Sequence, residues 1–517
     1  MEEKHTSFII TITGPSQSGK TLVLNKLHEV GKILRKKGYD FYPTLVQKET
    51  TRELRVEELA DIDKGKKIDV KHVEEISEDC DLVYQTYGKR YGIKTQELRT
   101  LLDEGKFPYA VVNDIRSVEA LKKAFPNRVL SIFLFRKIPD LSDFRVGAEN
   151  RGNVSEEQIQ ERYAKAVAIY RMYIENIALF DRVILNAIEY SKAKLNSKDC
   201  IIDRQITNII TGVFNGKIQL RRNSAALHSD IPKTFVIAGN SASGKDELVR
   251  AIQSMGKMDA EIIPKYTVRK QEKDDENEMI CQFIPNEKLM ETYTKKYEED
   301  LARVLKKLDS FDRSVIVRFR KDWEEMKSRV VKKIAKGRDM FWDDVAKATA
   351  SEREKFYQKN PNYIDLYKVE KEGELVYIDE IDETKLVRYE GEEYIVYRAN
   401  GKIYGFKLKE THEGGKYHVV VASNLGVFNL LKKRLGNNNV AIIYSHSQIS
   451  EKEYLKNSND ISAKEKVKAF DKTLNDYVDN IVNYDHVTIY AQSQLLNSKT
   501  IEEEELIDQI FRLFRVY

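Results

Sequence analysis

The chain has 517 residues, too many for one ordinary hydrophobic core, and this length predicts about three domain-sized units. Its 41% hydrophobic and 33% charged residues fit a soluble globular protein. A net charge of +4 is small for this size, so global electrostatics give no sign of a nucleic-acid binder.

The first residues and the cysteines narrow the class of protein. The chain start lacks the basic-then-apolar pattern of a secretion signal, and no apolar run reaches the ~18 residues that a membrane span needs. We therefore expect a cytoplasmic protein with no membrane partner. Cys80, Cys200 and Cys281 are dispersed, which argues against a disulfide framework or a zinc cluster and favours a packing role.

A glycine-rich motif lies near the start of the chain. Residues 14–21 read GPSQSGKT and complete the pattern G-x-x-x-x-G-K-[ST] between a strand-like run at 8–13 and a helical stretch at 22–35. In that context backbone amides and the lysine cradle a polyphosphate, and the following hydroxyl can ligate Mg²⁺. We expect nucleotide contacts from Gly14, Ser16, Ser18, Gly19, Lys20 and Thr21, with Thr21 also the metal ligand.

A near-copy of this motif recurs at 239–246, and other segments repeat in the same order. LVYQTYGKRYGI at 82–93 parallels IVYRANGKIYGF at 395–406, and 180–184 parallels 484–488. Short β-rich runs alternate with helical stretches, which is typical of βαβ units around a largely parallel sheet. The sequence thus predicts two homologous α/β domains, at 1–219 and 233–517, joined by the polar linker 220–232.

The second domain is longer than the first. The loop glycine and the Y-G tyrosine are 77 residues apart in the first (Gly14 to Tyr91) and 165 apart in the second (Gly239 to Tyr404). We therefore expect an insertion at about 285–375, mostly helical, with strand-like residues 374–381 starting the return to the sheet. Residues 313–338 hold ten Lys/Arg against three Asp/Glu, which fits a solvated helix face or a patch for an anionic partner.

The first copy resembles the guanylate kinase family over most of residues 8–217. Residues 48–55, KETTRELR, are similar to the family's T-T-R-x-x-R segment, and GKRYG at 88–92 is similar to its G-N-Y-Y-G. Two guanidinium groups three residues apart can clamp a phosphate dianion. The resemblance implies that Lys48, Arg52, Arg55 and Tyr91 bind the acceptor; a solvent-facing charged turn and a packing tyrosine are the plainer alternatives.

Residues 150–157 followed by Arg162 resemble the family's lid, whose arginines reach the transferred phosphoryl group. With Lys20, the catalytic residues implied are Arg145, Arg151 and Arg162, although any one of them can instead pair with a neighbouring glutamate. Asn186 ends a segment similar to the family's last strand, which borders the adenine pocket.

Two departures leave the acceptor open. Leu82 and about Ile115 stand where the family has the acidic readers of guanine, although Asp81 and Asp114 are adjacent and could substitute. The ribose 1,5-bisphosphate phosphokinases, a side branch of the family, also lack those readers, and their segments resemble 82–92 and 111–116, which includes Asn113. A phosphosugar acceptor that Asn113 helps to bind therefore competes with a nucleotide.

The second copy keeps the nucleotide-binding candidates Gly239, Gly244 and Lys245, with Asp246 in place of Thr21 as a possible magnesium ligand. Its other motif residues are mostly lost: Glu272 replaces the partner of Arg55, Ser458 and Ala469 replace lid arginines, and Tyr490 replaces Asn186. We interpret it as a degenerate, inactive copy, because each missing cation removes transition-state stabilisation.

Taken together, these features predict an α/β protein with two tandem phosphate-loop kinase domains, whose parallel sheets are flanked by helices. The expected function is that of an ATP- and Mg²⁺-dependent phosphotransferase that acts on a nucleoside monophosphate resembling GMP or dGMP. The alternatives are a phosphosugar kinase and a non-catalytic guanylate-kinase-like module that binds or regulates a partner.

Overall fold

The computed structural model describes these residues of the chain: 7–54, 58–59, 62, 68–86, 88–136, 145, 155–186, 201–220, 233–239, 245, 248–249, 252, 260–267, 281–283, 302–303, 306, 364–380, 383–399, 402–408, 417–447 and 475–490. They belong to two compact units. The first unit is made of Met1–Ala260, Gly415–Ser423 and Leu435–Tyr517, and the second of Glu261–Gly414 and Asn424–Arg434.

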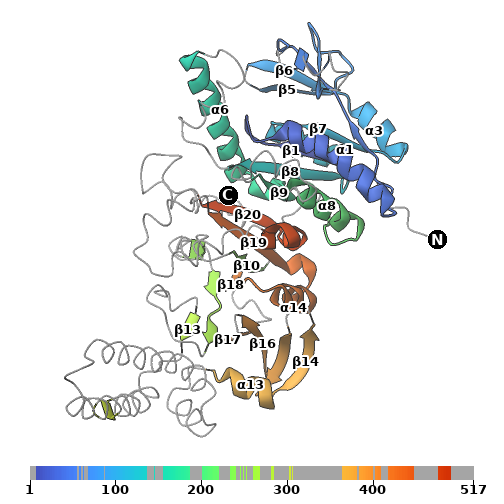
Figure 1. Cartoon of the computed structure of the whole chain (residues 1–517). Coiled ribbons are helices and arrows are strands. Elements are labelled where there is room, and N and C mark those ends of the chain that lie inside the picture. Colours follow the sequence, from blue (N-terminus) through green and yellow to red (C-terminus); the bar gives the residue numbers. More distant parts are fainter. Residues whose placement is uncertain are drawn as a thin grey trace, which may run out of the picture. The chain divides into compact units, whose positions relative to one another are not determined.

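The first unit contains a five-stranded parallel sheet, called sheet A, in the order β2-β7-β1-β8-β9 (Figure 1). Nearly every residue of its four longer strands is buried, as a parallel sheet covered by helices requires. The predicted βαβ organisation is therefore confirmed. The strands are β1 (Ile9–Thr13), β2 (Pro43–Leu45), β7 (Phe107–Val111), β8 (Val129–Arg136) and β9 (Arg182–Asn186).

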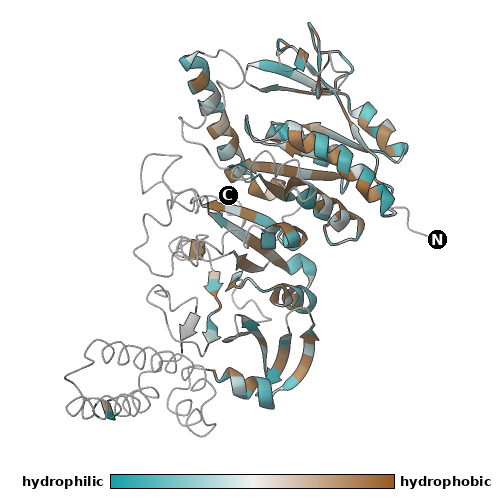
Figure 2. Ribbon diagram, viewed as in Figure 1, coloured by the Kyte–Doolittle hydropathy of each residue, from teal (hydrophilic) through white to brown (hydrophobic). Residues whose placement is uncertain are grey.

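Helices connect and cover these strands. The helix after the glycine-rich loop buries Leu27, Val30 and Leu34 along one stripe and exposes polar residues on the other face, and the two colours of α1 in Figure 2 show this division. It begins at Lys20, two residues earlier than predicted, so Lys20 and Thr21 lie in its first turn. The helices are α1 (Lys20–Lys36), α3 (Thr95–Asp103), α4 (Ile115–Ala124), α6 (Glu156–Glu175), η1 (Ile177–Leu179) and α8 (Ile201–Phe214).

A smaller sheet B, in the order β4-β3-β6-β5, completes the first half of the chain. Its strands are β3 (Lys48–Thr50), β4 (Val70–His72), β5 (Leu82–Thr86) and β6 (Lys89–Ile93). The last two form an antiparallel hairpin in which Tyr84 lies opposite Tyr91, and their rings stack with centroids 5.4 Å apart. This pair fixes the register of the hairpin that carries the Y-G element.

Sheet C has the order β11-β18-β10-β19-β20, which matches sheet A position by position, because β10, like β1, is the central strand that enters a glycine-rich loop. β10 pairs in parallel with β18 and β19, and β19 with β20. Its elements are β10 (Thr234–Ala238), β11 (Ala260–Ile262), β18 (Tyr417–Val421), η4 (Asn437–Asn439), β19 (Val440–Ser447), η5 (Ile481–Asn483) and β20 (His486–Tyr490).

The second unit is built on a six-stranded sheet D in the order β13-β12-β17-β16-β15-β14. Leu366, Val369, Val387 and Ile403 form its buried core. Residues 374–379 are a strand, as predicted, and together with β15 they add two strands beyond the four that match sheet B. The elements are β12 (Lys265–Thr267), β13 (Cys281–Phe283), α13 (Leu366–Glu372), β14 (Glu374–Asp379), β15 (Thr384–Tyr389), β16 (Glu392–Ala399), β17 (Lys402–Lys407) and α14 (Leu425–Leu435).

Most of the predicted insertion, including the basic segment 313–338, lies outside the described residues, as does the predicted linker 220–232 beyond its first residue. Within the part of the chain that the structure covers, no helix is both long enough and apolar enough to cross a membrane.

A buried ion pair connects α4 to the β8–β9 pair. Lys122 Nζ lies 2.8 Å from Asp181 Oδ2, and both side chains are only 2% exposed. The same carboxylate oxygen accepts hydrogen bonds from Ser131 N (2.8 Å) and Ser131 Oγ (2.7 Å). The hydrogen bonds and the ammonium together offset the desolvation of the carboxylate.

We predict that Lys122→Met lowers the free energy of unfolding of the first unit by about 3–5 kcal/mol, because it leaves Asp181 as an uncompensated buried charge. Urea denaturation followed by circular dichroism measures the loss. The matched control is Lys123→Met, which removes an exposed lysine from the next position of the same helix. Equal effects of the two substitutions would contradict the assignment.

Candidate functional site

The glycine-rich loop lies between the carboxyl end of β1 and the start of α1, and neighbouring strands hold it in place. Three side chains that end or follow β7, β8 and β9 bond to its backbone: Asn113 Oδ1 accepts from Gly14 N (3.1 Å), Arg136 Nη1 donates to Gln17 O (2.6 Å), and Asn186 Nδ2 donates to Ser18 O (2.7 Å). The loop is thus fixed at the edge where parallel α/β sheets bind ligands.

Gly19 is required by both conformation and space. Its φ of +96° lies in the left-handed region, and a Cβ added there would come within 2.6 Å of Asn186 Nδ2. As the N-cap of α1 it makes no side-chain capping bond, so the first amides of the helix remain available to an anion.

Two polar groups border this helix start. Ser18 Oγ is buried and has no hydrogen-bond partner among the described residues. Lys20 Nζ bends back over the loop and donates to Gly14 O (2.8 Å) and Pro15 O (2.6 Å). Thr21, the next residue, is exposed. An unsatisfied hydroxyl, open amides and an ammonium in one place fit a polyphosphate tail.

Arg52, the first predicted clamp arginine, is half-buried and already has an anionic partner. Its two terminal nitrogens contact both oxygens of the Glu58 carboxylate, Nη1 to Oε2 at 2.8 Å and Nη2 to Oε1. Burial lowers the pKa of Arg52, but the Glu58 carboxylate outweighs this and raises it. His72 joins the group, with Nδ1 2.8 Å from Arg52 O and Nε2 3.5 Å from Glu58 Oε2. Arg55 lies outside the described residues.

Lys48 and Tyr91 lie on adjacent strands of sheet B. The Lys48 ammonium is buried, donates to Val111 O (2.7 Å), lies 3.2 Å from Asp69 Oδ2 and is 5.4 Å from the centroid of the Tyr91 ring. This cation–π contact accounts for the tyrosine at that position.

The Asp69 carboxylate is the anionic partner of Lys48 and lies 3.2 Å from its ammonium. Burial by itself would raise the pKa of Asp69. The positive charge of Lys48, with smaller contributions from Arg52 and Lys20, outweighs burial, so the pKa lies below its usual range.

Glu49, next to Lys48, is a buried anion. Its Oε2 accepts from Ser77 N (2.8 Å), Ser77 Oγ (2.6 Å) and Cys80 Sγ (3.6 Å). The Ser77 hydrogen bonds, followed by weaker contributions that include the charge of Lys94, lower its pKa from 4.5 to about 2. These bonds hold the loop 73–80 against β3.

The carboxylates next to the missing guanine readers are bound elsewhere. Asp81 accepts from Thr95 N (2.8 Å) and from the Thr95 hydroxyl at the start of α3. Asp114 caps α4, where Oδ2 accepts from Ser117 N (2.8 Å) and Ser117 Oγ (2.7 Å). Both therefore stabilise helix N-termini. Leu82 pairs with Ile93 on the hairpin, and Ile115 is the first residue of α4.

Of the predicted lid arginines, Arg145 forms a half-exposed ion pair with Glu156 Oε1 at 2.5 Å, the plainer of the two alternatives. Arg162 lies in α6, but its side chain is outside the described part of the chain, as is all of Arg151. That Arg151 and Arg162 reach the transferred phosphoryl group therefore stays a prediction.

The second glycine-rich loop repeats several contacts of the first. Lys245 Nζ donates to Gly239 O (2.9 Å), and Gly239 N donates to Ser423 Oγ (3.2 Å) beyond β18, where the first loop uses Asn113. On sheet D, Lys265 lies 5.8 Å from the ring centroid of Tyr404, which stacks on Tyr397 at 5.6 Å. Gly244 and Asp246 lie outside the described residues.

Sequence reasoning missed Glu58, Asp69, His72 and Arg136. None belongs to a spaced motif. Asp69 and His72 reach Lys48 and Arg52 because β4 pairs with β3, whereas Glu58 lies only six residues beyond Arg52. Arg136 ends an eight-residue buried strand, and a charge at such a place is the one signal that could have identified it. Among the described residues no group of three or more His, Cys, Asp or Glu is placed to hold a metal ion.

No protein-family model matches the chain. The guanylate kinase of Caldanaerobacter subterraneus subsp. tengcongensis is 28% identical over 214 residues, 40% of this chain and 94% of that protein. The guanylate kinase of Lactobacillus acidophilus is 26% identical over 200 residues, 38% of this chain and 92% of that protein. Among solved structures, the guanylate kinase of Anaplasma phagocytophilum matches 44% of this chain and 95% of that chain, at 18% identity and a TM-score of 0.27.

About 40% of this chain is therefore homologous to guanylate kinases at low identity.

The lowered pKa of Glu49 predicts a pH dependence. A carboxylate whose folded pKa is about 2 and whose ordinary value is 4.5 contributes stability that is complete above about pH 4.5 and is lost as the pH falls toward 2. We expect Glu49→Gln to reduce the slope of unfolding free energy against pH in this window, measured by urea denaturation. The exposed Glu74→Gln is the control, and a wild-type slope in Glu49→Gln would refute the prediction.

Proposed function

We propose that residues 8–217 form an ATP- and Mg²⁺-dependent phosphotransferase of the guanylate kinase type, which transfers the γ-phosphoryl group of ATP to the phosphate of a nucleoside monophosphate. The observation that carries the proposal is the first glycine-rich loop, where the uncapped start of α1, the buried Ser18 hydroxyl and the Lys20 ammonium gather at the carboxyl edge of sheet A. The homology to guanylate kinases supports the same assignment.

The donor side would use the first loop. Its amides, the buried hydroxyl of Ser18 and the ammonium of Lys20 would hold the phosphate tail, and the exposed hydroxyl of Thr21 would bind Mg²⁺. When bound, Mg²⁺ neutralises charge on the β- and γ-phosphate oxygens. Asn186 would lie beside the nucleotide. Because its Nδ2 already donates to Ser18 O, its main role would be to hold the loop. Ser16 and Gly14 complete the predicted donor set.

The acceptor phosphate would enter through an exchange of partners. Arg52 now contacts both oxygens of Glu58, and a phosphate offers the same bidentate geometry with more charge. Lys48 and the Tyr91 hydroxyl would face the same anion. We propose that Arg55 and the lid residues Arg145, Arg151 and Arg162 add the remaining positive charge, with Arg145 leaving its exposed partner Glu156, since such pairs are weak.

A phosphosugar acceptor is the second candidate, and one observation favours it. Leu82 and Ile115 are apolar, and the adjacent carboxylates Asp81 and Asp114 are bonded to helix starts, so neither is available at its present place to read a guanine edge. In this case Asn113 would serve the acceptor from its place beside Gly14.

We further propose that the chain has a catalytic domain at 1–219, a linker at 220–232 and a degenerate guanylate-kinase-like copy at 233–517 with its insertion at about 285–375. The matching strand orders of sheets A and C and the repeated lysine and tyrosine contacts support this division. Gly239, Gly244, Lys245 and Asp246 would let the second copy bind a nucleotide without turnover. The basic segment 313–338 would be the place for an anionic partner.

ATP consumption measured against GMP, dGMP, AMP, other nucleotides and ribose 1,5-bisphosphate tests these assignments. We expect Lys20→Ala to lower kcat at least 100-fold, as the loss of a transition-state cation does. We expect Arg52→Ala to raise the acceptor KM about tenfold or more, because a charged hydrogen bond is lost. Lys32→Ala, on the exposed face of α1, and Arg171→Ala, on that of α6, should behave as wild type.

Turnover of the sugar alone would move the acceptor assignment to the phosphosugar. If no acceptor supports ATP consumption, the enzymatic function is contradicted and a non-catalytic binding module is favoured.

The close approach of Gly19 to Asn186 gives a separate prediction. We expect Gly19→Ala to weaken ATP binding at least tenfold in equilibrium dialysis, because the methyl group would displace Asn186 from Ser18 O. Gly38→Ala is the matched control: its φ of +88° carries the same left-handed strain of about 1–2 kcal/mol, but no heavy atom lies within 4 Å of the added Cβ. Equal weakening by both variants would assign the effect to backbone strain alone.

A further inference from the structure

The two parallel sheets of the first unit meet through a reciprocal pair of hydrogen bonds. Tyr173 Oη donates to Val487 O at 2.6 Å, and Tyr477 Oη donates to Val183 O at 2.8 Å. Tyr477 follows Tyr173 by 304 positions, and Val487 follows Val183 by the same 304 positions. Replacing each residue of one bond by its counterpart gives the other bond, which is the signature of an isologous, two-fold interface.

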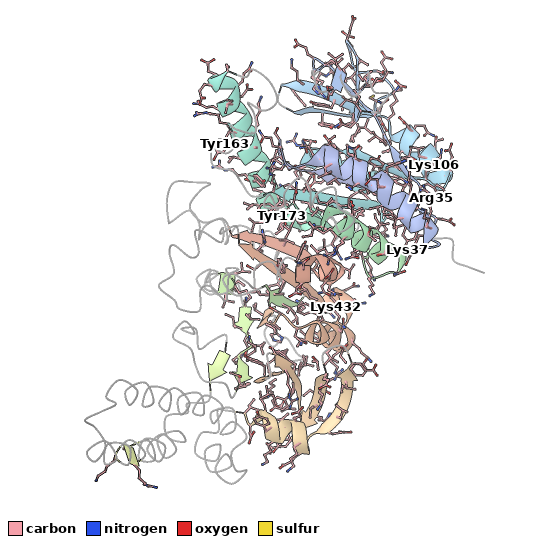
Figure 3. The ribbon with its side chains drawn as sticks, viewed as in Figure 1. Arg35, Lys37, Lys106, Tyr163, Tyr173 and Lys432 are labelled. Carbon is pink, nitrogen blue, oxygen red and sulfur yellow. The ribbon has the colours of Figure 1, made fainter. Side chains whose placement is uncertain are left out.

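The side chains that hold the two tyrosines repeat as well. Tyr173 lies near the C-terminal end of α6 (Figure 3), and Tyr477 lies in the helical residues 475–480. Each tyrosine packs in a cluster of three aromatic rings, and the centroid distances of the two clusters agree within 0.4 Å. They are 4.2, 5.4 and 5.5 Å for Phe133–Tyr173, Phe133–Phe180 and Tyr173–Phe180, and 4.5, 5.0 and 5.5 Å for Tyr444–Tyr477, Tyr444–Tyr484 and Tyr477–Tyr484.

A third contact lies next to the two-fold axis that relates the two clusters. Phe135 and His446 lie at the ends of β8 and β19, with ring centroids 5.5 Å apart and planes at 83°. They are 311 positions apart, as are Phe133 and Tyr444 of the two clusters, so they are counterparts. Only residues next to a two-fold axis touch their own counterparts. Burial lowers the pKa of His446 to about 4, so this contact is between neutral rings at neutral pH.

The tyrosines also donate hydrogen bonds to carbonyl groups of edge strands. β9 and β20 are the edge strands of sheets A and C, and edge carbonyls buried at an interface need donors. Tyr477 satisfies Val183 O, and Gln205 satisfies both the amide and the carbonyl of Leu185, each at 2.9 Å. Side chains, rather than another strand, thus complete the hydrogen bonding of β9 here.

The edge strand β9 ends at a residue that holds the first loop. Asn186, which donates to Ser18 O, is three residues beyond Val183 and one beyond Leu185 on the same strand. Arg136, which donates to Gln17 O, directly follows Phe135 on β8. Two of the three strand ends that hold the loop therefore continue from residues that contact the second half of the chain, Val183 through Tyr477 and Phe135 through His446.

We propose that sheet C serves as the built-in partner subunit of sheet A, and that Tyr477 is a positioning residue for the first glycine-rich loop. The hydroxyl of Tyr477 fixes β9 at Val183, and β9 in turn fixes Asn186 against Ser18 and Gly19. The role of the second half is then to complete the interface that a separate copy would otherwise supply. As a statement about nucleotide binding, this rests on the proposed function of the first loop.

Anchors on α8 fit this role. Arg204 donates to Asn475 Oδ1 (2.9 Å) and pairs with Asp479, and Asn208 Nδ2 donates to Val478 O (2.9 Å). These bonds hold the helical residues 475–480, which carry Tyr477, at the side of sheet A.

The test compares Tyr477→Phe with Tyr173→Phe in the full-length chain. Both variants delete one buried hydroxyl from equivalent places, so they make a matched pair. Amide hydrogen exchange, read by mass spectrometry without nucleotide, should rise about tenfold at residues 14–20 in Tyr477→Phe and stay at the wild-type rate there in Tyr173→Phe. An equal rise at 14–20 in both variants, or no rise there in Tyr477→Phe, would overturn the proposal.

Kinetics supply a second readout. Positioning predicts that Tyr477→Phe raises the KM for ATP several-fold with kcat within about twofold, whereas a purely structural loss lowers kcat through the folded fraction and leaves KM unchanged. The two proposals fail separately. A wild-type chain that neither binds nor turns over ATP would defeat the proposed function, while the exchange pattern would still decide the role of Tyr477.

Discussion

The loop between β1 and α1 is held by three side chains that come from the ends of three other strands, and the rest of the site depends on this constraint. Asn113, Arg136 and Asn186 bond to its backbone at successive places. They can do so only because β7 and β8 flank β1 and β9 follows β8 in the sheet, with all four strands parallel. The parallel order therefore converts distant residues into one rigid cradle, and α1 starts from it with open amides.

The acceptor side shows how buried cations are kept charged before any ligand arrives. Glu58 binds Arg52, and Asp69 and Val111 O bind Lys48. A buried charge without a partner would cost several kcal/mol, so these internal partners are a condition of folding. Under the proposed function, an acceptor phosphate would have to compete with the Glu58 carboxylate for the Arg52 guanidinium. The affinity of Arg52 for a phosphate would therefore be the difference between its interaction with the phosphate and its interaction with Glu58.

The second half of the chain repeats the strand order of the first. Sheet C has the order of sheet A, and Lys245 donates to Gly239 O as Lys20 does to Gly14 O. The reciprocal tyrosine bonds match as well. If the second half is the degenerate copy proposed above, its packing surface would still support the neighbouring site, which is the role proposed for Tyr477.

The sequence by itself determined the features encoded by short spacing, which are the loop with Lys20 and Thr21 and the α/β class, because strand and helix periodicity and a glycine-rich turn are local properties. Only the tertiary structure decided which charges meet. Asp69 reaches Lys48 through the β3–β4 pairing, and Asp81 is bonded to Thr95 at the start of α3 instead of to a ligand. Such partners are separated by chain segments whose path no local pattern specifies, so they follow from the closed fold and not from composition or spacing.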